Sequence, residues 1–371
     1  MLKAQFEYFK NLDGLRFLCF LAVFTVHSLH TDDPQIKSNF LFKTIVDGLL
    51  ANGDLGVNFF FVLSGFLITF LLILEKQDSG KINIINFWIK RVIRIWPLYF
   101  ICVFFGFVIF PFIKGYFGQS QEDSAELKYY LLFLGNFDII KNGWPNATEL
   151  GILWSISIEE QFYLVWPILL SVFPIKKYWI IFLGIILMSI TFRCFNFDPL
   201  VYRYHTFSCI SDMAVGGLGA WIIHVARVRE YIVKLSKLNI ALIYIAFGIA
   251  FIFKVQLFEK YYFTSIFERL IISVLIVLII LEQNYSLNSF YKMGNFKLLS
   301  KLGLTTFGNY MLHIICLLIV FETAIFFKLS SNIYTTVIIL PICGLVLTLI
   351  VGKLSFIIIE KPFLNLRRFL K

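Results

Sequence analysis

The chain has 371 residues and a formal net charge of +10, with 59% hydrophobic, 18% aromatic and only 15% charged residues. Soluble domains contain about 45–50% apolar and about 25% charged residues. With 44 Phe and a mean hydropathy of +0.82, too few polar side chains remain to cover a surface in water. The composition therefore excludes a soluble globular protein and predicts an all-α integral membrane protein.

Ten apolar segments come close to the roughly 20 residues that a membrane-crossing helix needs. In chain order they lie at residues 15–31, 55–74, 95–113, 152–173, 178–194, 205–226, 238–254, 262–281, 302–321 and 332–352. The first is preceded by charged residues and has no small-residue cleavage site after it, so we interpret it as an anchor and not as a signal peptide. Residues 127–140 are apolar but too short to cross, which favours a re-entrant or interfacial piece. We find no repeat or linker and expect one membrane domain over residues 1–371, without an appended soluble domain.

Ten spans place both termini on one side of the membrane, and the basic residues predict which side. The termini and the loops on their side hold most of the 33 Lys and Arg but a minority of the 23 Asp and Glu. Both termini are therefore expected in the cytoplasm, in a multi-pass protein of the inner membrane. The net charge then reflects an asymmetry across the bilayer, so no nucleic-acid partner is needed to explain it.

The cysteines show no pattern of pairing or metal binding. Six of them are scattered through apolar runs without a C-x-x-C pair: Cys19, Cys102, Cys194, Cys209, Cys316 and Cys343. We interpret them as small core residues and not as a disulfide framework. No metal site is predicted, because the histidines and carboxylates also lack ligand spacing.

Ionisable side chains inside apolar segments are costly and are therefore functional candidates. Near the cytoplasmic face lie Arg16 and the run 87–97, which contains Lys90, Arg91 and Arg94. The polar residues that the predicted topology places toward the outer face are His27, Asn58, Glu159, Glu160, Asp212 and His313. Five segments thus direct polar groups to one depth.

Arg16 and His27 lie on one face of the first segment. They are eleven residues apart, which is about 16 Å along a helix with an angular offset of about 20°. This arrangement suits a ligand with a phosphate head at the cytoplasmic mouth and a reactive end deep in the membrane. Taken singly, His27 is better explained as an interfacial histidine satisfied by water or a carbonyl, and Arg16 as a positive-inside anchor.

Lys90, Arg91 and Arg94 bring three cations within about one helical turn, flanked by Trp88 and Trp96. Arginine forks bind phosphate oxygens two at a time, so this run is a candidate phosphate site. The alternative is a basic amphipathic segment lying on anionic lipid head groups.

Residues 154–163 bring two adjacent carboxylates, Glu159 and Glu160, into an apolar helix. Neighbours on a helix point about 100° apart, so at most one of them shares a given partner. A buried glutamate beside an imidazole can fix its tautomer and stabilise its charged form, which makes the imidazole a better base for a hydroxyl. The alternative is a glutamate that caps the helix start and faces water.

Two other polar positions leave alternatives open. His313 follows Tyr310 on one helix face, so it either lines the same cavity or bonds to a neighbouring helix. Asp212 precedes three glycines within residues 216–219. Because no strand precedes them, these glycines favour close packing between helices over a nucleotide-binding loop.

Several motifs occur in order along the chain. They are Leu12-Asp13-Gly14-Leu15-Arg16 with His27 after ten further residues, Gly56 to Leu67, Phe87 to Pro97, Trp154 to Pro167, and weaker echoes at Asn309 to His313 and Glu360 to Pro362. Together they resemble the integral membrane acyltransferase-3 family, whose members acylate sugars and related surface molecules. The matches extend from residue 12 to residue 362 and so cover the whole chain.

The resemblance implies a donor and an acceptor on opposite sides of the membrane. The donor would be acyl-CoA, usually acetyl-CoA, at the cytoplasmic side, and the acceptor a hydroxyl near the outer face. By position, His27 resembles the family's essential histidine and Arg16 its partner on the first helix. Arg91 and Arg94 resemble the donor-side cations.

Two departures from the family pattern affect the expected roles. Asn58 stands where an aspartate is usual, which removes an acid there. Lys90 replaces the first arginine of the basic motif, which weakens bidentate phosphate binding. The family pattern favours Glu159 as the functional carboxylate. The helix geometry favours Glu160 instead, because Glu160 shares a polar face with Trp154.

We therefore expect a membrane-bound O-acyltransferase that acts on a cell-envelope carbohydrate or glycolipid, with His27 as general base, oriented by Glu159 or Glu160. No cofactor is bound permanently; the residues expected to hold the donor, acyl-CoA, are Arg16, Lys90, Arg91 and Arg94. Those expected to bind the acceptor are Asn58, Ser64, Trp154, Asp212, Tyr310 and His313. Lipopolysaccharide, capsule, peptidoglycan, a glycolipid or a small metabolite all fit as acceptor. Direct transfer and an acyl-enzyme relay both stay open.

Two rival functions differ in class. A transporter or flippase for an amphiphilic sugar would also place charges at mid-membrane, but it gives no reason for the Arg-x-x-Arg run. A scaffold subunit would leave the buried carboxylates and His27 without a role. Consumption of acyl-CoA separates the first hypothesis from both rivals.

Overall fold

The computed structural model describes residues 8–29, 31, 33–40, 42–118, 120, 122–329 and 332–369. Within these ranges the chain is helical and contains no strand. Each of the ten apolar segments overlaps one long helix. These helices are α1 (Lys10–Ser28), α3 (Leu55–Ser79), α4 (Ile84–Phe104), α9 (Leu153–Val172), α10 (Tyr178–Phe195), α12 (Thr206–Ile222), α14 (Lys237–Ile252), α15 (Tyr262–Tyr285), α17 (Thr306–Phe326) and α18 (Leu340–Ser355).

Shorter helices connect or extend the long ones. They are α2 (Pro34–Ser38), α5 (Phe110–Tyr116), α6 (Leu127–Leu131), α7 (Gly135–Asn142), α8 (Thr148–Gly151), α11 (Pro199–Tyr204), α13 (Ala226–Val233), α16 (Lys297–Gly303) and α19 (Lys361–Asn365). A π-helical stretch, η3 (Phe105–Ile109), joins α4 to α5, and another, η8 (Phe356–Glu360), joins α18 to α19. The apolar segment at 127–140 forms α6 and α7, neither of which is long enough to span a bilayer, as its length predicts.

Six helical segments of the described residues are long and apolar enough to cross a membrane: Asn52–Ser79, Ile84–Tyr116, Ile175–Phe195, Tyr262–Tyr285, Thr306–Phe326 and Thr335–Arg368. The bent pair Pro199–Ile222 and Arg227–Val233 makes a seventh if it counts as one span. The chain is therefore a multi-pass membrane protein. A count of ten spans stays a prediction, since α1, α9 and α14 are not among these segments. The cytoplasmic position of the termini also stays a prediction.

The outer faces of several helices are apolar, as a hydrocarbon environment requires. Leu187 of α10 is 63% exposed, Leu238 of α14 is 69% exposed and Ile342 of α18 is 56% exposed. In water such a surface would be unfavourable, because each apolar side chain gains free energy on leaving water. These faces indicate where lipid surrounds the bundle.

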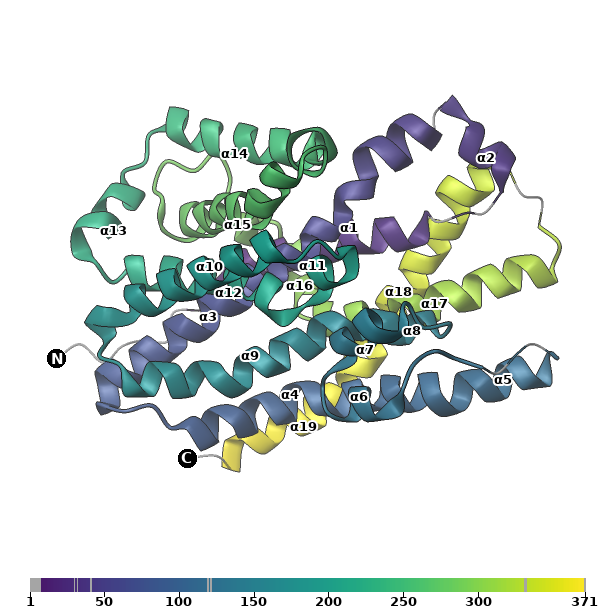
Figure 1. Cartoon of the computed structure of the whole chain (residues 1–371), viewed down its shortest axis with the longest axis horizontal. Coiled ribbons are helices and arrows are strands. Elements are labelled where there is room, and N and C mark those ends of the chain that lie inside the picture. Colours follow the sequence, from purple (N-terminus) through teal and green to yellow (C-terminus); the bar gives the residue numbers. More distant parts are fainter. Residues whose placement is uncertain are drawn as a thin grey trace.

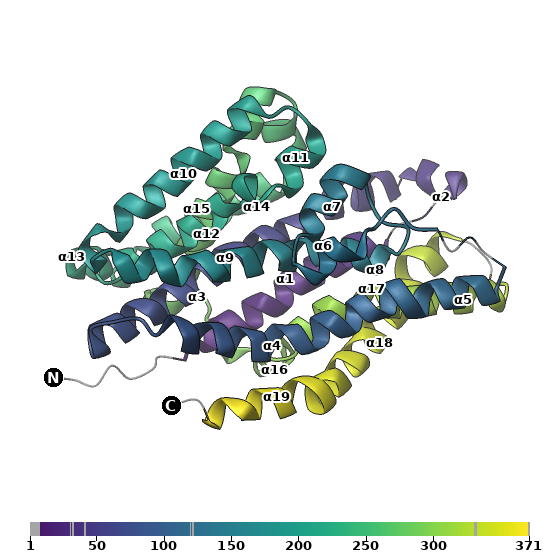
Figure 2. The same cartoon turned by 60° about the horizontal axis from the view of Figure 1, so that its bottom comes forward.

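The helices pack around α1 and the pair formed by α3 and α12. Helix α1 contacts α3, α16 and α17, and its Asp13 is buried in the bundle. Helices α13, α14 and α15 gather on one side of α3 and α12, whereas α4, α17 and α18 lie on the other (Figures 1 and 2). The start of α1 and the segment α19 lie at the same end of the molecule.

Glycines allow the closest helix contact, that of α3 with α12. A Cβ added at Gly216 would lie 2.0 Å from the carbonyl oxygen of Val62, and one at Gly65 would lie 2.0 Å from that of Met213. A Cβ added at Gly219 would lie 2.2 Å from the side-chain Cγ2 of Val277 on α15. The predicted packing role of the glycines after Asp212 is confirmed.

The cysteines are free thiols in positions that mostly match a core role. Cys102, Cys209 and Cys316 are buried, and Cys19 and Cys194 are half-buried. The expectation fails at Cys343, which is exposed on α18 because it points away from the bundle toward the lipid.

Candidate active site

A cavity of about 310 Å³ lies at the end of the bundle where α1 starts and α19 ends. Helices α1, α3, α4, α9, α16 and α17 and the segment from η8 to residue 367 contribute to its wall. Its charged lining residues are Asp13, Arg16, Arg91, Arg94, Glu159, Glu360 and Arg367. Four guanidinium groups and three carboxylates therefore face one space.

Helix α4 presents Arg91 and Arg94 to the cavity because they are three residues apart and share a face. The structure does not bring Lys90 to the cavity with them, since a residue adjacent to Arg91 points about 100° away around the helix. Lys90 is exposed and is not among the lining residues. Arg367 takes its place and donates from Nη2 to the backbone carbonyl of Lys90 at 2.8 Å.

Arg16 is held at the cavity by a carboxylate one helical turn before it. Its Nη1 donates to Oδ1 of Asp13 at 2.7 Å, and Asp13 is only 3% exposed. Asp13 also accepts a hydrogen bond from the hydroxyl of Tyr8. The arginine of the first motif is thus positioned by the aspartate of the same motif.

Several buried polar atoms of the cavity wall have no hydrogen-bond partner within the described ranges. They are Nε of Arg91, Nε of Arg367, Oγ1 of Thr306 and Oε1 of Glu360. An unpaired buried donor costs about 1–3 kcal/mol. Three of these four atoms are donors, so the wall is suited to an anionic, oxygen-rich ligand.

The two adjacent glutamates face different spaces. Glu159 lines the cavity and accepts hydrogen bonds from Ser64 Oγ at 3.1 Å and from Tyr163 Oη at 2.6 Å. Glu160 accepts from Trp96 Nε1 at 3.1 Å and lines a second pocket of about 320 Å³ between α4 and α9. Arg91 and Tyr163 line both spaces and form the wall between them.

His27 is paired with a second histidine, not with a glutamate. Its Nδ1 lies 2.9 Å from Nε2 of His313 on α17. The structure does not pair His27 with Glu159 or Glu160 as expected: Glu159 accepts from Ser64 and Tyr163, and Oε2 of Glu160 accepts from Trp96. Of the alternatives open for His313, bonding to a neighbouring helix is the one that the structure shows.

Tyr310 contacts His313 of the histidine pair and also lines the cavity. Its ring lies 5.7 Å from that of His313, and its hydroxyl lies 2.7 Å from Ser155 Oγ. Tyr310 and Ser155 line the cavity, whereas His27 and His313 do not. The cavity therefore contains Arg16 but does not reach His27 at the other end of the expected polar stripe.

The residues expected to bind the acceptor do not all meet. Ser64 and Tyr310 line the cavity, but Asn58, Trp154 and Asp212 are not among its lining residues. Trp154 packs instead against the ring of Tyr204, with a centroid distance of 5.0 Å. The cavity therefore brings together the donor-side cations and only part of the acceptor set.

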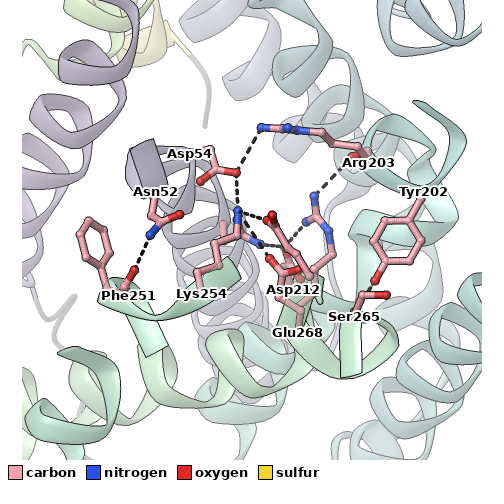
Figure 3. A network of polar contacts seen from close by, with 12 residues as sticks. Asn52, Asp54, Tyr202, Arg203, Asp212, Phe251, Lys254, Ser265 and Glu268 are labelled. Atoms are coloured by element: carbon pink, nitrogen blue, oxygen red, sulfur yellow. Dashed lines mark hydrogen bonds and ion pairs between the residues drawn. The ribbon is translucent and has the colours of Figure 1, made fainter. Parts of the chain in front are cut away.

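Asn58 and Asp212 belong to a buried polar network between α3, α12 and α15. Asp212 accepts from Asn58 Nδ2 at 3.0 Å, from Ser273 Oγ at 3.1 Å and from Arg269 Nη1 at 2.6 Å. Nearby, Lys254 pairs with Asp54 at 2.8 Å (Figure 3). Both oxygens of Asp212 are therefore occupied by the protein itself.

Residues that could hold a metal do not come together. Within the described ranges no three His, Cys, Asp or Glu side chains form a group suited to a metal ion. The candidate site consists of guanidinium groups, carboxylates and an imidazole pair, which suits anion binding and proton transfer.

Comparison with known proteins assigns the class. A family model described as an acyltransferase domain matches residues 9–355. The peptidoglycan O-acetyltransferase OatA of Listeria monocytogenes is 26% identical over 377 residues, covering 96% of this chain and 56% of that protein. The O-acetyltransferase OatA of Staphylococcus aureus is 31% identical over 172 residues, covering 44% of this chain and 25% of that protein. No solved structure matches the chain.

The chain belongs to the membrane acyltransferase family that its motifs resemble. It spans about half the length of the Listeria relative. The family match covers α1, α4, α9 and α17, which carry most of the charged groups and both imidazoles of the candidate site. Glu360 and Arg367 lie after the matched residues.

Proposed function

We propose that the chain is an O-acyltransferase that moves an acyl group, in the first instance acetyl, from cytoplasmic acyl-CoA to a hydroxyl of a cell-wall carbohydrate. The observation that carries this proposal is the cavity in which Arg16, Arg91, Arg94 and Arg367 converge. The acceptor class is argued from the Listeria relative, whose name describes a peptidoglycan O-acetyltransferase. Inner-membrane location and cytoplasmic termini complete the proposal.

The four guanidinium groups suit the phosphates of coenzyme A. Arginine binds phosphate through two parallel hydrogen bonds, and the unpartnered Nε atoms of Arg91 and Arg367 supply free donors. Arg94 is exposed, so the phosphate end would enter at that side of the cavity. The thioester end would then extend along α1 toward Tyr310, over a distance comparable to the rise from Arg16 to His27.

His27 would act as the general base for the acceptor hydroxyl. It takes the proton as the hydroxyl oxygen attacks the thioester carbonyl, and the new ester forms as the carbon–sulfur bond breaks. The departing thiolate of coenzyme A then receives a proton from the imidazolium, which restores the neutral histidine. Tyr310 lines the donor cavity and contacts His313, the partner of the base, so the acyl carbonyl and the acceptor would meet near this side chain.

Binding and turnover of labelled acetyl-CoA by the purified protein test the proposal. We expect saturable binding that weakens about 10- to 100-fold in Arg91→Ala, because one charge-assisted contact contributes about 1.5–3 kcal/mol. Movement of a glycolipid across proteoliposomes without acetyl-CoA consumption would support the transporter instead. A protein that neither binds acetyl-CoA nor transfers acetyl to a glycan would contradict the proposal.

A further inference from the structure

The two histidines of the site form a pair whose proton positions are determined by their surroundings. His313 is fully buried and His27 is half-buried. Rings of Phe20 and Phe24 lie within 6.0 Å and 6.3 Å of the His313 ring. No carboxylate of the described residues is hydrogen-bonded to either imidazole, so this apolar environment favours the neutral form of His313.

The hydrogen bond to the backbone assigns the tautomer of His313. Its Nδ1 lies 2.5 Å from the carbonyl oxygen of Tyr310, and a carbonyl oxygen only accepts hydrogen bonds. The Nδ1 atom of His313 therefore carries the proton. In a neutral imidazole the other nitrogen, Nε2, is then an acceptor.

The tautomer of His27 follows from the 2.9 Å contact between its Nδ1 and Nε2 of His313. Because Nε2 of His313 has no proton, Nδ1 of His27 must donate in this contact. His27 then carries its proton on Nδ1 and its lone pair on Nε2. The partly exposed member of the pair thus has a free basic nitrogen.

We propose that His313 is a positioning residue that holds His27 in the Nδ1–H tautomer, with Nε2 as the basic nitrogen of the transfer reaction. The catalytic half of this inference rests on the proposed function, whereas the tautomer does not. When His27 Nε2 takes the proton of the acceptor hydroxyl, the Nδ1–H of the resulting imidazolium stays donated to His313. A neutral imidazole, anchored by a backbone carbonyl, performs the orienting task that is usually given to a carboxylate.

The proposal predicts different effects for two substitutions of similar size at position 313. In His313→Gln, the side-chain carbonyl oxygen can reach the place of Nε2 and accept from His27. In His313→Leu the acceptor is lost, and Nδ1 of His27 has no partner. His224→Gln is a matched control, because the Nδ1 atom of His224 contacts the Ala220 carbonyl of its own helix, outside the candidate site.

Nitrogen NMR of the imidazole rings reads the tautomer directly. The chain has five histidines, so ¹⁵N-histidine labelling in lipid gives few signals, which single substitutions assign. We expect His27 to show a protonated Nδ1 and an unprotonated Nε2 in the wild type and in His313→Gln. In His313→Leu we expect that tautomer to be lost. A protonated Nε2 on His27 in the neutral wild type would overturn the inference.

Kinetics test the positioning role. We expect kcat to fall about 10- to 100-fold in His313→Leu, with the KM for acetyl-CoA unchanged, and to recover in His313→Gln. An equal loss of kcat in both variants, with both still folded by thermal unfolding, would overturn the positioning role. Absence of acetyl transfer in the wild type would contradict the proposed function, while the NMR result would still decide the tautomer.

Discussion

Arg367 is an arginine of the cavity that was not among the residues expected to hold the donor. It lines the cavity, whereas the adjacent Arg368 is exposed and is not among the lining residues. Its donation to the Lys90 carbonyl ties the last described segment to α4. The sequence alone does not distinguish Arg367 from Arg368, because together they form a basic pair that fits the positive-inside rule.

We predict that Arg367→Ala weakens acyl-CoA binding about 10- to 100-fold, because it removes one charge-assisted phosphate contact of about 1.5–3 kcal/mol. The measurement is the KM for acetyl-CoA in membranes that contain equal amounts of protein. Arg368→Ala is the matched control and should keep the wild-type KM. Equal effects of the two substitutions would remove Arg367 from the donor site.

At the scale of helices, the buried network around Asp212 joins α3, α12 and α15. The carboxylate of Asp212 is fully buried and contacts Arg269, which is 9% exposed. A buried charge that loses its partner costs about 3–5 kcal/mol, although the pair as a whole adds little stability. The network is therefore expected to fix how these helices fit together.

We predict that Asp212→Asn lowers the unfolding temperature strongly and that Asp212→Asn with Arg269→Met recovers most of the loss, since no unpaired charge remains. Thermal unfolding in detergent measures both. Glu126→Gln is the control: Glu126 lies outside this network and pairs with the exposed Lys128 of α6 and Lys141 of α7, where an ion pair contributes little to stability, so the unfolding temperature should change little. Normal stability but lost acetyl transfer in Asp212→Asn would assign Asp212 to the acceptor site instead.

The glycine contacts between α3 and α12 give a second prediction for helices. A Cβ at Gly216 would meet the Val62 carbonyl, and backbone atoms cannot move aside without separating the helices. Gly216→Ala should therefore reduce folded yield and unfolding temperature, whereas Gly184→Ala on α10 has no heavy atom within 4 Å and should be neutral or slightly stabilising. A neutral Gly216→Ala would contradict the packing of these helices.

For the whole molecule, the sequence predicted the positions of the helices well but not the contacts between distant residues. The segment expected at 55–74 is α3 (Leu55–Ser79), and that expected at 178–194 is α10 (Tyr178–Phe195). Hydropathy is a local property, so it is visible in one stretch of chain. The basic run on α4 was also recognisable, because the spacing of Arg91 and Arg94 places them on one face.

Contacts that depend on packing were not predictable in this way. His27 and His313 are 286 residues apart, and no local pattern states which helix supplies the partner of His27. Glu159 and Glu160 were plausible partners of His27 only because they are carboxylates and were expected at the same depth in the membrane. Their direction around α9 sends one to the cavity and the other to the pocket beside it, which only the packed structure reveals.

The orientation of the molecule in the membrane is a further prediction. With cytoplasmic termini, the turn after α3 lies inside and the segment before α9 lies outside. In a variant without native cysteines, Ser79→Cys should react with an impermeant maleimide only after the cells are opened. Thr148→Cys should react on intact cells. The reverse pattern would contradict the positive-inside argument.

The central claim is that His27 carries out acyl transfer to an envelope carbohydrate. The most direct measurement is the acetate released by mild alkali from the envelope glycans of cells that express either the wild type or His27→Ala at equal membrane levels. We predict that the ester-linked acetate above the vector background disappears in His27→Ala while acetyl-CoA binding by the purified variant persists. Equal acetate from the two strains would contradict the account.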